Sequence, residues 1–222
     1  MATLLELTLR SHPFAYITDN ELEALIGGTP DSRHSMVKRA LAKGDLMRIK
    51  RGLYCLGAWL HPQKPHPFEL AQKIYSPSYI SLESALSYHQ LIPEAVHTIT
   101  CVTPKRAQTF TTPLGEFKYF TLPQFNFFMG VERREENTRC FFMATPWKAI
   151  TDYVYCYKKE WQGINPLIKS LRIEVEDLPK PNAQLFAELG NYYKSRRIIN
   201  FLKELLRDLN HLSFAEDRAA DS

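Results

Sequence analysis

The stretch from residue 40 to residue 56, ALAKGDLMRIKRGLYCL, constrains the fold more than any other part of this chain. A helical apolar pattern stops at Gly44, because glycine readily takes the left-handed conformation that ends many helices. Two short strands are expected next, joined by a tight turn at Arg51-Gly52. Side chains of the first strand alternate between the two faces of the sheet. Leu46, Arg48 and Lys50 are expected on one face, and Met47 and Ile49 on the other. The stretch therefore predicts a helix end and a small β-hairpin tipped with Lys50 and Arg51.

Two helices are expected immediately before this hairpin. Thr18 with Glu21 forms a capping-box pattern for a helix over about 20–26, which a glycine pair then ends. Thr29, followed by a proline, can cap a second helix over about 30–43. A short helix, a glycine-containing turn and a second helix are typical of the helix-turn-helix motif. With the hairpin after it, the pattern predicts an N-terminal winged helix-turn-helix.

Positive charge is concentrated on the second helix and the hairpin. The net charge of the 222-residue chain is only +4, but every charged residue from 33 to 51 except Asp45 is basic. A surface that faces phosphates concentrates cations in this way. Projected as a helix, residues 30–43 place Val37, Ala40 and Leu41 on one side. The opposite side carries Ser32, Ser35, Lys38, Arg39 and Ala42.

Such a polar face suits the major groove of DNA. Small side chains permit close approach, hydroxyls reach phosphates or base edges, and arginine can bind guanine through two hydrogen bonds. The alternative is a solvent-exposed face with ordinary charges. A hairpin carrying Arg48, Lys50 and Arg51 beside this face favours the DNA interpretation.

The composition indicates no metal, cofactor or membrane. Four cysteines show neither CxxC spacing nor a cluster with histidine, so neither a zinc site nor a disulfide framework is expected. They are Cys55, Cys101, Cys140 and Cys156. The chain shows no secretory signal, and no apolar run approaches the ~18 residues that a membrane span needs. A cytoplasmic protein without a cofactor is expected.

The proline-rich segment 57–68 marks a domain boundary. We expect a DNA-binding domain over 1–60, a second domain over 61–214 and a frayed tail over 215–222. The fold class is α+β, and the second domain is expected to be mixed, with a small antiparallel sheet and C-terminal helices. Its expected strands cover 79–80, 97–103, 117–122, 125–133 and 138–144. Expected helices cover 1–10, 67–75, 82–89 with Ser81 as cap, 146–159, 163–173, 182–193 and 196–211.

Five segments occur in the order found in one known family. They are GDLMRIKRGLY after the second helix, PSYISLESALSYHQLIP at 77–93, VTPKR at 102–106, TPLGEFKYF at 112–120 and MATPWKAITDYVY at 143–155. In these segments the chain resembles the AbiEi family, the antitoxin and repressor half of bacterial type IV toxin–antitoxin systems for abortive phage infection. Trp147 stands where the family usually has an acidic residue.

The resemblance implies a two-domain protein that binds inverted repeats of double-stranded DNA in its own promoter, with self-association on DNA as a further expectation. It implies that the second domain counters a nucleotidyltransferase-like toxin without a stable complex. It also places DNA contacts on the second helix and the hairpin, at Ser32, Arg33, Ser35, Lys38, Arg39, Arg48, Lys50 and Arg51.

Two other functions compete for the second domain. Glu116-x-Lys118 resembles half of a nuclease motif in which carboxylates hold Mg²⁺, and Glu94 is the nearest acid upstream. No GxSxG, HExxH or P-loop occurs, so no enzyme is expected. A protein-interaction module is the other alternative. Its aromatic anchors would be Trp147, Tyr153, Tyr155, Tyr157 and Trp161.

Overall fold

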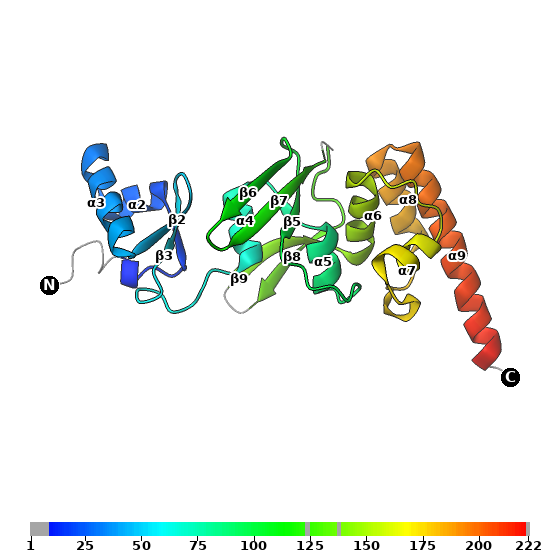
Figure 1. Cartoon of the computed structure of the whole chain (residues 1–222). Coiled ribbons are helices and arrows are strands. Elements are labelled where there is room, and N and C mark those ends of the chain that lie inside the picture. Colours follow the sequence, from blue (N-terminus) through cyan, green and yellow to red (C-terminus); the bar gives the residue numbers. More distant parts are fainter. Residues whose placement is uncertain (1–8, 123–124, 137–138, 221–222) are drawn as a thin grey trace. The chain divides into compact units, whose positions relative to one another are not determined.

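The computed structural model describes residues 9–122, 125–136 and 139–220, with side chains as far as residue 212 (Figure 1). Within these residues the fold is mixed, with eight α-helices and two sheets of three and six strands. The chain divides into two compact units. One comprises Met1–Ser76 with Thr111–Glu116, and the other comprises Pro77–Phe110 with Phe117–Ser222.

The first unit contains a three-stranded antiparallel sheet in the order β1-β3-β2. Its elements in chain order are β1 (Tyr16–Thr18), α2 (Asp19–Ile26), α3 (Pro30–Lys43), β2 (Leu46–Lys50), β3 (Leu53–Leu56) and α4 (Pro67–Ile74). The two helices and the hairpin predicted from the sequence are therefore confirmed, in the predicted order. Most of the N-terminal helix predicted over 1–10 lies outside the described residues; Leu9 and Arg10 are helical.

Polar caps fix the ends of α2 and α3. The Thr18 hydroxyl accepts a hydrogen bond from the Glu21 N–H at 3.2 Å, and the Glu21 carboxylate accepts one from the Thr18 N–H at 2.7 Å. At the start of α3, the Thr29 hydroxyl accepts from the Ser32 N–H at 3.3 Å. Gly44 ends α3 in the left-handed conformation, with φ of 78°. The capping box and the glycine stop predicted from the sequence are confirmed.

The hairpin differs from its predicted alternation by one residue. Arg48 pairs with Tyr54, but Lys50 pairs with Leu53, so Ile49 is an extra residue in β2. A bulge of this kind reverses the alternation of side chains between the two sheet faces. Arg48 and Lys50 therefore lie on opposite faces, although the unbroken alternation of the sequence placed them together.

The two faces of the first sheet have different neighbours. One face packs on α2 and α3 in a core of Leu9, Ile17, Leu22, Val37, Ala40, Leu46, Tyr54, Leu56 and Leu60. The other face contacts α4, where the Tyr16 hydroxyl donates to Glu69 Oε1 at 3.1 Å and Lys50 Nζ donates to the Ile74 carbonyl. Because these contacts connect α4 with the sheet, the first unit continues to Ser76, beyond the predicted boundary at residue 60.

The second sheet has the order β6-β7-β5-β4-β9-β8. Its strands are β4 (Tyr79–Ile80), β5 (Ile99–Thr103), β6 (Gln108–Thr112), β7 (Gly115–Thr121), β8 (Val131–Glu136) and β9 (Arg139–Ala144). We predicted a small antiparallel sheet, but β5 pairs parallel with β7, and β4 pairs parallel with β9. The unpredicted strand β6 reverses the chain between β5 and β7, so β7 can run parallel to β5.

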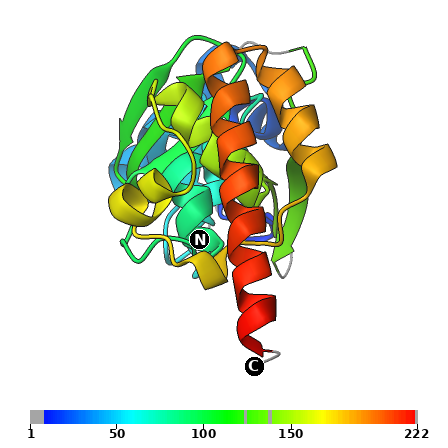
Figure 2. The ribbon, with the colours of Figure 1, turned by 90° about the vertical axis from the view of Figure 1, so that its right-hand side faces the viewer.

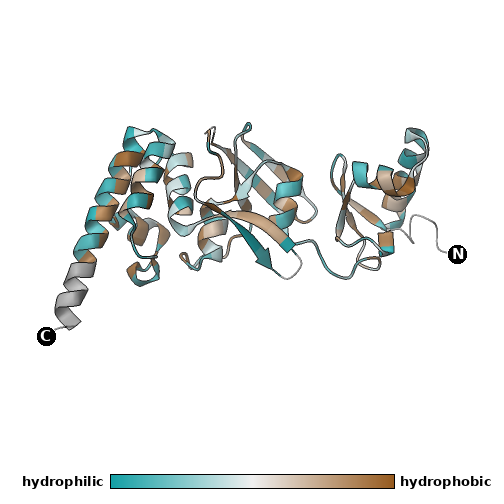
Figure 3. Cartoon of the chain, turned by 180° about the vertical axis from the view of Figure 1, so that it is seen from behind, coloured by the Kyte–Doolittle hydropathy of each residue, from teal (hydrophilic) through white to brown (hydrophobic). Residues whose placement is uncertain are grey.

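The helices of the second unit follow the predicted order. They are α5 (Leu82–Tyr88), α6 (Pro146–Cys156), α7 (Asn165–Leu171), the 3-10 helix η1 (Val175–Asp177), α8 (Ala183–Tyr193) and α9 (Arg196–Ala220). α8 and α9 lie side by side (Figure 2). Hydrophobic and hydrophilic residues alternate along α9 (Figure 3). Among the described residues, no helix combines the length and the apolar character needed to cross a membrane.

Three predicted details were wrong. α9 does not end near residue 211 but continues to Ala220, because the residues that follow include no glycine or proline and several strong helix formers. The strand expected over 125–133 begins only at Val131. Ser81 precedes α5 but makes no side-chain cap, since its hydroxyl donates to Asp152 Oδ2 at 2.7 Å.

Candidate nucleic-acid interface

One side of α3 presents polar side chains to solvent. Ser32, Ser35, Lys38 and Arg39 are all exposed, whereas Val37 and Ala40 on the other side are buried. Arg39 Nε donates to the Ser35 carbonyl at 3.4 Å. This hydrogen bond keeps the Arg39 guanidinium close to the helix backbone. Two hydroxyls and two cations therefore form a row that a ligand can reach.

Arg33, also predicted to contact DNA, is engaged within the protein. Its Nη1 donates to the Gly28 carbonyl at 2.6 Å, and its Nη2 lies 2.7 Å from Glu23 Oε1. Only 17% of its side-chain surface is exposed. The guanidinium therefore stabilises the turn between α2 and α3, and the structure separates Arg33 from the exposed row.

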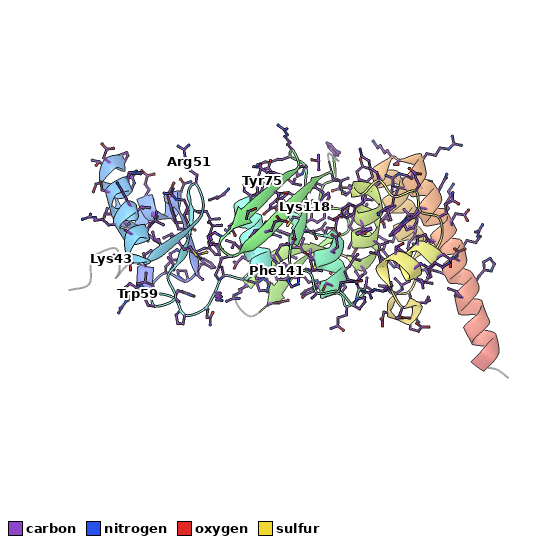
Figure 4. The ribbon with its side chains drawn as sticks, viewed as in Figure 1. Lys43, Arg51, Trp59, Tyr75, Lys118 and Phe141 are labelled. Atoms are coloured by element: carbon purple, nitrogen blue, oxygen red, sulfur yellow. The ribbon has the colours of Figure 1, made fainter. Side chains whose placement is uncertain are left out.

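The three basic residues of the hairpin also differ from one another. Arg51 is exposed at the β2–β3 turn (Figure 4). Arg48 is exposed and lies on the same face of the sheet as Tyr54. Its guanidinium carbon is 5.9 Å from the centre of the Tyr54 ring. Lys50 lies on the opposite face and donates to the Ile74 carbonyl at the end of α4. A cation is favourable at a helix C-terminus, so this contact is a structural one.

A groove is lined by residues of α2 and β3 and by the side of α3 that carries Val37. Its lining consists of Asp19, Leu22, Glu23, Pro30, Arg33, His34, Val37 and Tyr54. Burial, and then the negative charge of Asp19, raises the pKa of Tyr54. The sequence analysis missed Asp19 and Tyr54, because Tyr54 faces Arg48 only in the bulged register.

A second polar cluster, also missed, lies inside the second unit. Lys148 Nζ donates to Asp152 Oδ1 at 2.8 Å and to the Tyr193 hydroxyl at 2.7 Å. The Tyr79 hydroxyl donates to Asp152 Oδ2 at 3.0 Å. Both charged side chains are fully buried. The available sequence signal was a Lys-Asp pair four residues apart in an otherwise apolar and aromatic helix. The cluster is enclosed in the core of the second unit.

The residues of the nuclease alternative have other contacts in the structure. Glu116 and Lys118 lie on β7, and Lys118 Nζ is 4.9 Å from the centre of the Phe120 ring. Arg172 Nε donates to Glu94 Oε1 at 2.8 Å. Within the described part of the chain, no group of three or more His, Cys, Asp or Glu side chains could hold a metal ion.

The aromatic anchors of the protein-interaction alternative separate into two sets. Trp147 is buried against Phe186, with ring centres 5.0 Å apart, and Tyr155 packs on the buried Tyr193, with ring centres 5.1 Å apart. Tyr153 is half-buried and contacts the rings of Tyr157 and Trp161 at 4.7 and 5.6 Å. Only this second set forms a partly exposed aromatic cluster.

Comparison with known proteins identifies no relative: no protein-family model matches the chain, and a search of curated proteins gives no match.

Proposed function

We propose that the first unit is a winged helix-turn-helix domain that binds double-stranded DNA. The order β1-α2-α3-β2-β3 with the sheet order β1-β3-β2 supports this assignment. In such domains the second helix of the pair enters the major groove, and the hairpin lies against the neighbouring backbone. The observation that carries the proposal is the exposed row Ser32, Ser35, Lys38 and Arg39 on the second helix.

The contacts divide into two kinds. Lys38 and Arg39 stand on the helix that would enter the groove, so they are the proposed readers of base edges. Arg48 and Arg51 stand on the hairpin, so they are the proposed phosphate contacts. Arg33 and Lys50 leave the set of contact residues, because both hold structural hydrogen bonds.

The proposed role of the whole chain is that of a cytoplasmic repressor and antitoxin of the AbiEi kind. It would bind inverted repeats in its own promoter and counter a nucleotidyltransferase-like toxin without a stable complex. The support for this role is the resemblance of five sequence segments to that family. The test is coexpression with the product of an adjacent nucleotidyltransferase gene. Rescue of growth without copurification is expected, and failure to rescue growth contradicts the antitoxin role.

DNA binding is tested with the full chain and labelled duplexes from its own upstream region, by fluorescence anisotropy. Saturable binding that unlabelled upstream DNA displaces better than unrelated DNA is expected. Arg39→Ala should weaken it, whereas the control Arg207→Ala removes an exposed cation from α9 and should leave it unchanged. Equal displacement by both competitors would contradict a sequence-specific repressor.

A protein-interaction role is a second candidate for the second unit. The partly exposed cluster of Tyr153, Tyr157 and Trp161 favours it, because aromatic side chains are enriched at binding hot spots. Trp161→Ala should then abolish complementation of the toxin while DNA binding stays unchanged.

A further inference from the structure

The second sheet ends at a strand whose outer edge faces solvent. The sheet order places β8 last, with β9 as its neighbour. The Thr145 N–H donates to the Gly130 carbonyl at 2.9 Å, directly before the paired residues of β8. Backbone groups of an antiparallel strand point alternately to its two sides, so every second residue counted from Gly130 bonds to β9. The N–H and C=O groups of Arg133 and Glu135 therefore point away from β9.

The side chains of this edge strand alternate in charge along each face. On one face Glu132 Oε2 lies 2.6 Å from Arg134 Nη2, and on the other face Arg133 is ion-paired with Glu135. Between 37% and 59% of each of these side chains is exposed. An antiparallel copy of a strand presents its residues in reverse order, so a strand of this kind can be complementary to itself.

We propose that β8 pairs antiparallel with β8 of a second copy of this chain, about a two-fold axis at Arg133. In this register Glu132 of each copy lies opposite Arg134 of the other, so two pairs of opposite charge meet across the interface. Arg133 lies opposite itself, but each guanidinium keeps its ion pair with Glu135 of the same chain. The outward backbone groups of the two copies face one another and form a ladder. The interface is then the same surface on both chains, as two-fold symmetry requires.

The charge pattern favours this register over its neighbours. Two residues that lie opposite each other must turn their backbone groups to the same side, so the axis passes through a residue and not between two. An axis at Arg134 would bring Arg133 opposite Glu135 twice, but it would also oppose Arg134 to itself and Glu132 to Glu136 twice. An axis at Glu135 would pair only three residues of each strand, because β8 ends at Glu136.

The pairing gives the DNA-binding function a two-fold partner. A dimer with a two-fold axis matches the symmetry of an inverted repeat, so it would hold two copies for the two halves of one site. This role rests on the function proposed above, whereas the pairing itself rests on the second unit alone. The competing explanation is that the charges protect the edge, since charged side chains on edge strands commonly prevent association. In that case the chain would stay monomeric.

A charge exchange tests the register. Sedimentation equilibrium of the full chain without DNA should show a dimer that dissociates on dilution. Glu132→Arg and Arg134→Glu should each be monomeric, because like charges would then lie opposite each other. A mixture of the two variants should form a heterodimer, because two arginines of one chain would face two glutamates of the other. A monomeric parent chain, or a mixture that stays monomeric, would overturn the proposal.

The mixture also excludes a purely local effect of these charges. Within each variant residues 132 and 134 carry the same sign, so the ion pair inside the strand is lost in both. Recovery of a dimer in the mixture can therefore come only from pairs between the chains.

A backbone substitution tests the ladder. Arg133→Pro removes an N–H that points away from β9, and proline is tolerated at such positions of edge strands. Loss of this donor from both copies should weaken self-association at least about tenfold. Arg133→Ala is the matched control, because it removes the same side chain and keeps the N–H, so the dimer should persist. Thermal unfolding of both variants shows that they are folded. An Arg133→Pro dimer as strong as that of Arg133→Ala would rule out pairing through this edge.

Measurement without DNA keeps this inference separate from the proposed function. A dimer that shows the expected response to all these variants but binds no duplex would contradict the proposed function alone. Specific duplex binding by a chain that sediments as a monomer would contradict the pairing of β8 alone.

Discussion

Lys148 and Asp152 form an ion pair that is fully enclosed by the second unit. Burying charges is costly unless every charge has partners, and here the hydroxyls of Ser81, Tyr79 and Tyr193 complete the hydrogen bonding of the carboxylate. The pair therefore acts as one unit, and loss of either charge leaves the other without compensation.

Asp152→Ala should lower the free energy of unfolding by about 3–5 kcal/mol, because the Lys148 ammonium would stay buried without its partner. Replacing both residues together, with Lys148→Met and Asp152→Leu, should restore only part of the loss, because the hydroxyls that donate to Asp152 would still lack their acceptor. Urea unfolding followed by tryptophan fluorescence measures both variants. A loss of less than about 1 kcal/mol for Asp152→Ala would mean that water reaches the pair.

Buried tyrosines predict a loss of stability in alkali. Burial, and then the charge of Asp152, raises the pKa of Tyr79 and of Tyr193 well above the ordinary value. Above about pH 10 the unfolded chain loses these protons and the folded chain keeps them, so the free energy of unfolding should fall as pH rises. Burial lowers the pKa of Lys148, which acts in the opposite direction below about pH 10.4.

Urea unfolding at a series of pH values tests this prediction. In a Tyr79→Phe variant the decline above about pH 10 should be less steep, because one ionising group is removed. A slope unchanged by the substitution would contradict the assignment to Tyr79.

At the scale of single residues, the helical projection found the exposed row on α3, whereas the structure engages Arg33 and Lys50, two of the predicted contact residues, in hydrogen bonds within the protein. The helical projection depends on local spacing alone, and it is right for Ser32, Lys38 and Arg39. Arg33 bonds to carbonyls of the preceding turn, and Lys50 follows a bulge. Neither feature leaves a periodic signal in the sequence.

At the scale of elements, the hairpin turn depends on Gly52. Gly44 and Gly52 both have φ of 78°, a conformation that is strained for other residues. A Cβ on Gly44 meets nothing within 4 Å, whereas one on Gly52 meets Asp19 Oδ2 at 3.1 Å. A comparison of alanine substitutions at the two glycines therefore separates the cost of backbone strain from the cost of steric crowding.

Gly44→Ala should reduce the free energy of unfolding by about 1 kcal/mol through backbone strain alone. Gly52→Ala should cost more, because the Asp19 side chain must also shift away from the added methyl group. Thermal unfolding of the two variants beside the parent chain measures the difference. Equal losses would contradict the close packing of the turn against α2.

The recognition helix and the hairpin should respond differently to alanine substitution. Arg39→Ala should cost about 1–3 kcal/mol of binding free energy and relax the preference at one operator position, because a base contact would be lost. Arg51→Ala should weaken binding to all sequences alike, because a phosphate contact carries no sequence information. Competition binding with a set of single-position operator variants distinguishes the two. The same pattern from both variants would contradict the division of roles.

Elements with strong local signals were predicted well, and those defined by their neighbours were not. Caps and glycines determine the ends of α2 and α3 within a few residues of sequence. By contrast, β6 is a mostly polar segment without apolar alternation, and it is a strand because it pairs with β7. Similarly, the proline-rich segment suggested a boundary near residue 60, and only the contacts of α4 show that the first unit continues to Ser76.

At the scale of the whole molecule, the proposed function combines a DNA-binding unit with a second unit of separate role. The first unit carries the exposed cations Lys38, Arg39, Arg48 and Arg51. The charged pair and most buried tyrosines belong to the second unit, where they contribute to stability. Substitutions of these four cations should therefore change DNA binding, and substitutions in the second unit should change stability or antitoxin activity.

The salt dependence of duplex binding tests the central claim most directly. If Arg48 and Arg51 neutralise about two phosphates, the logarithm of the association constant should fall with the logarithm of salt concentration at a slope of about −1.8. Arg51→Ala should reduce the slope by about 0.9, the share of one phosphate. A slope near zero in the parent chain, or one that Arg51→Ala leaves unchanged, would contradict the account.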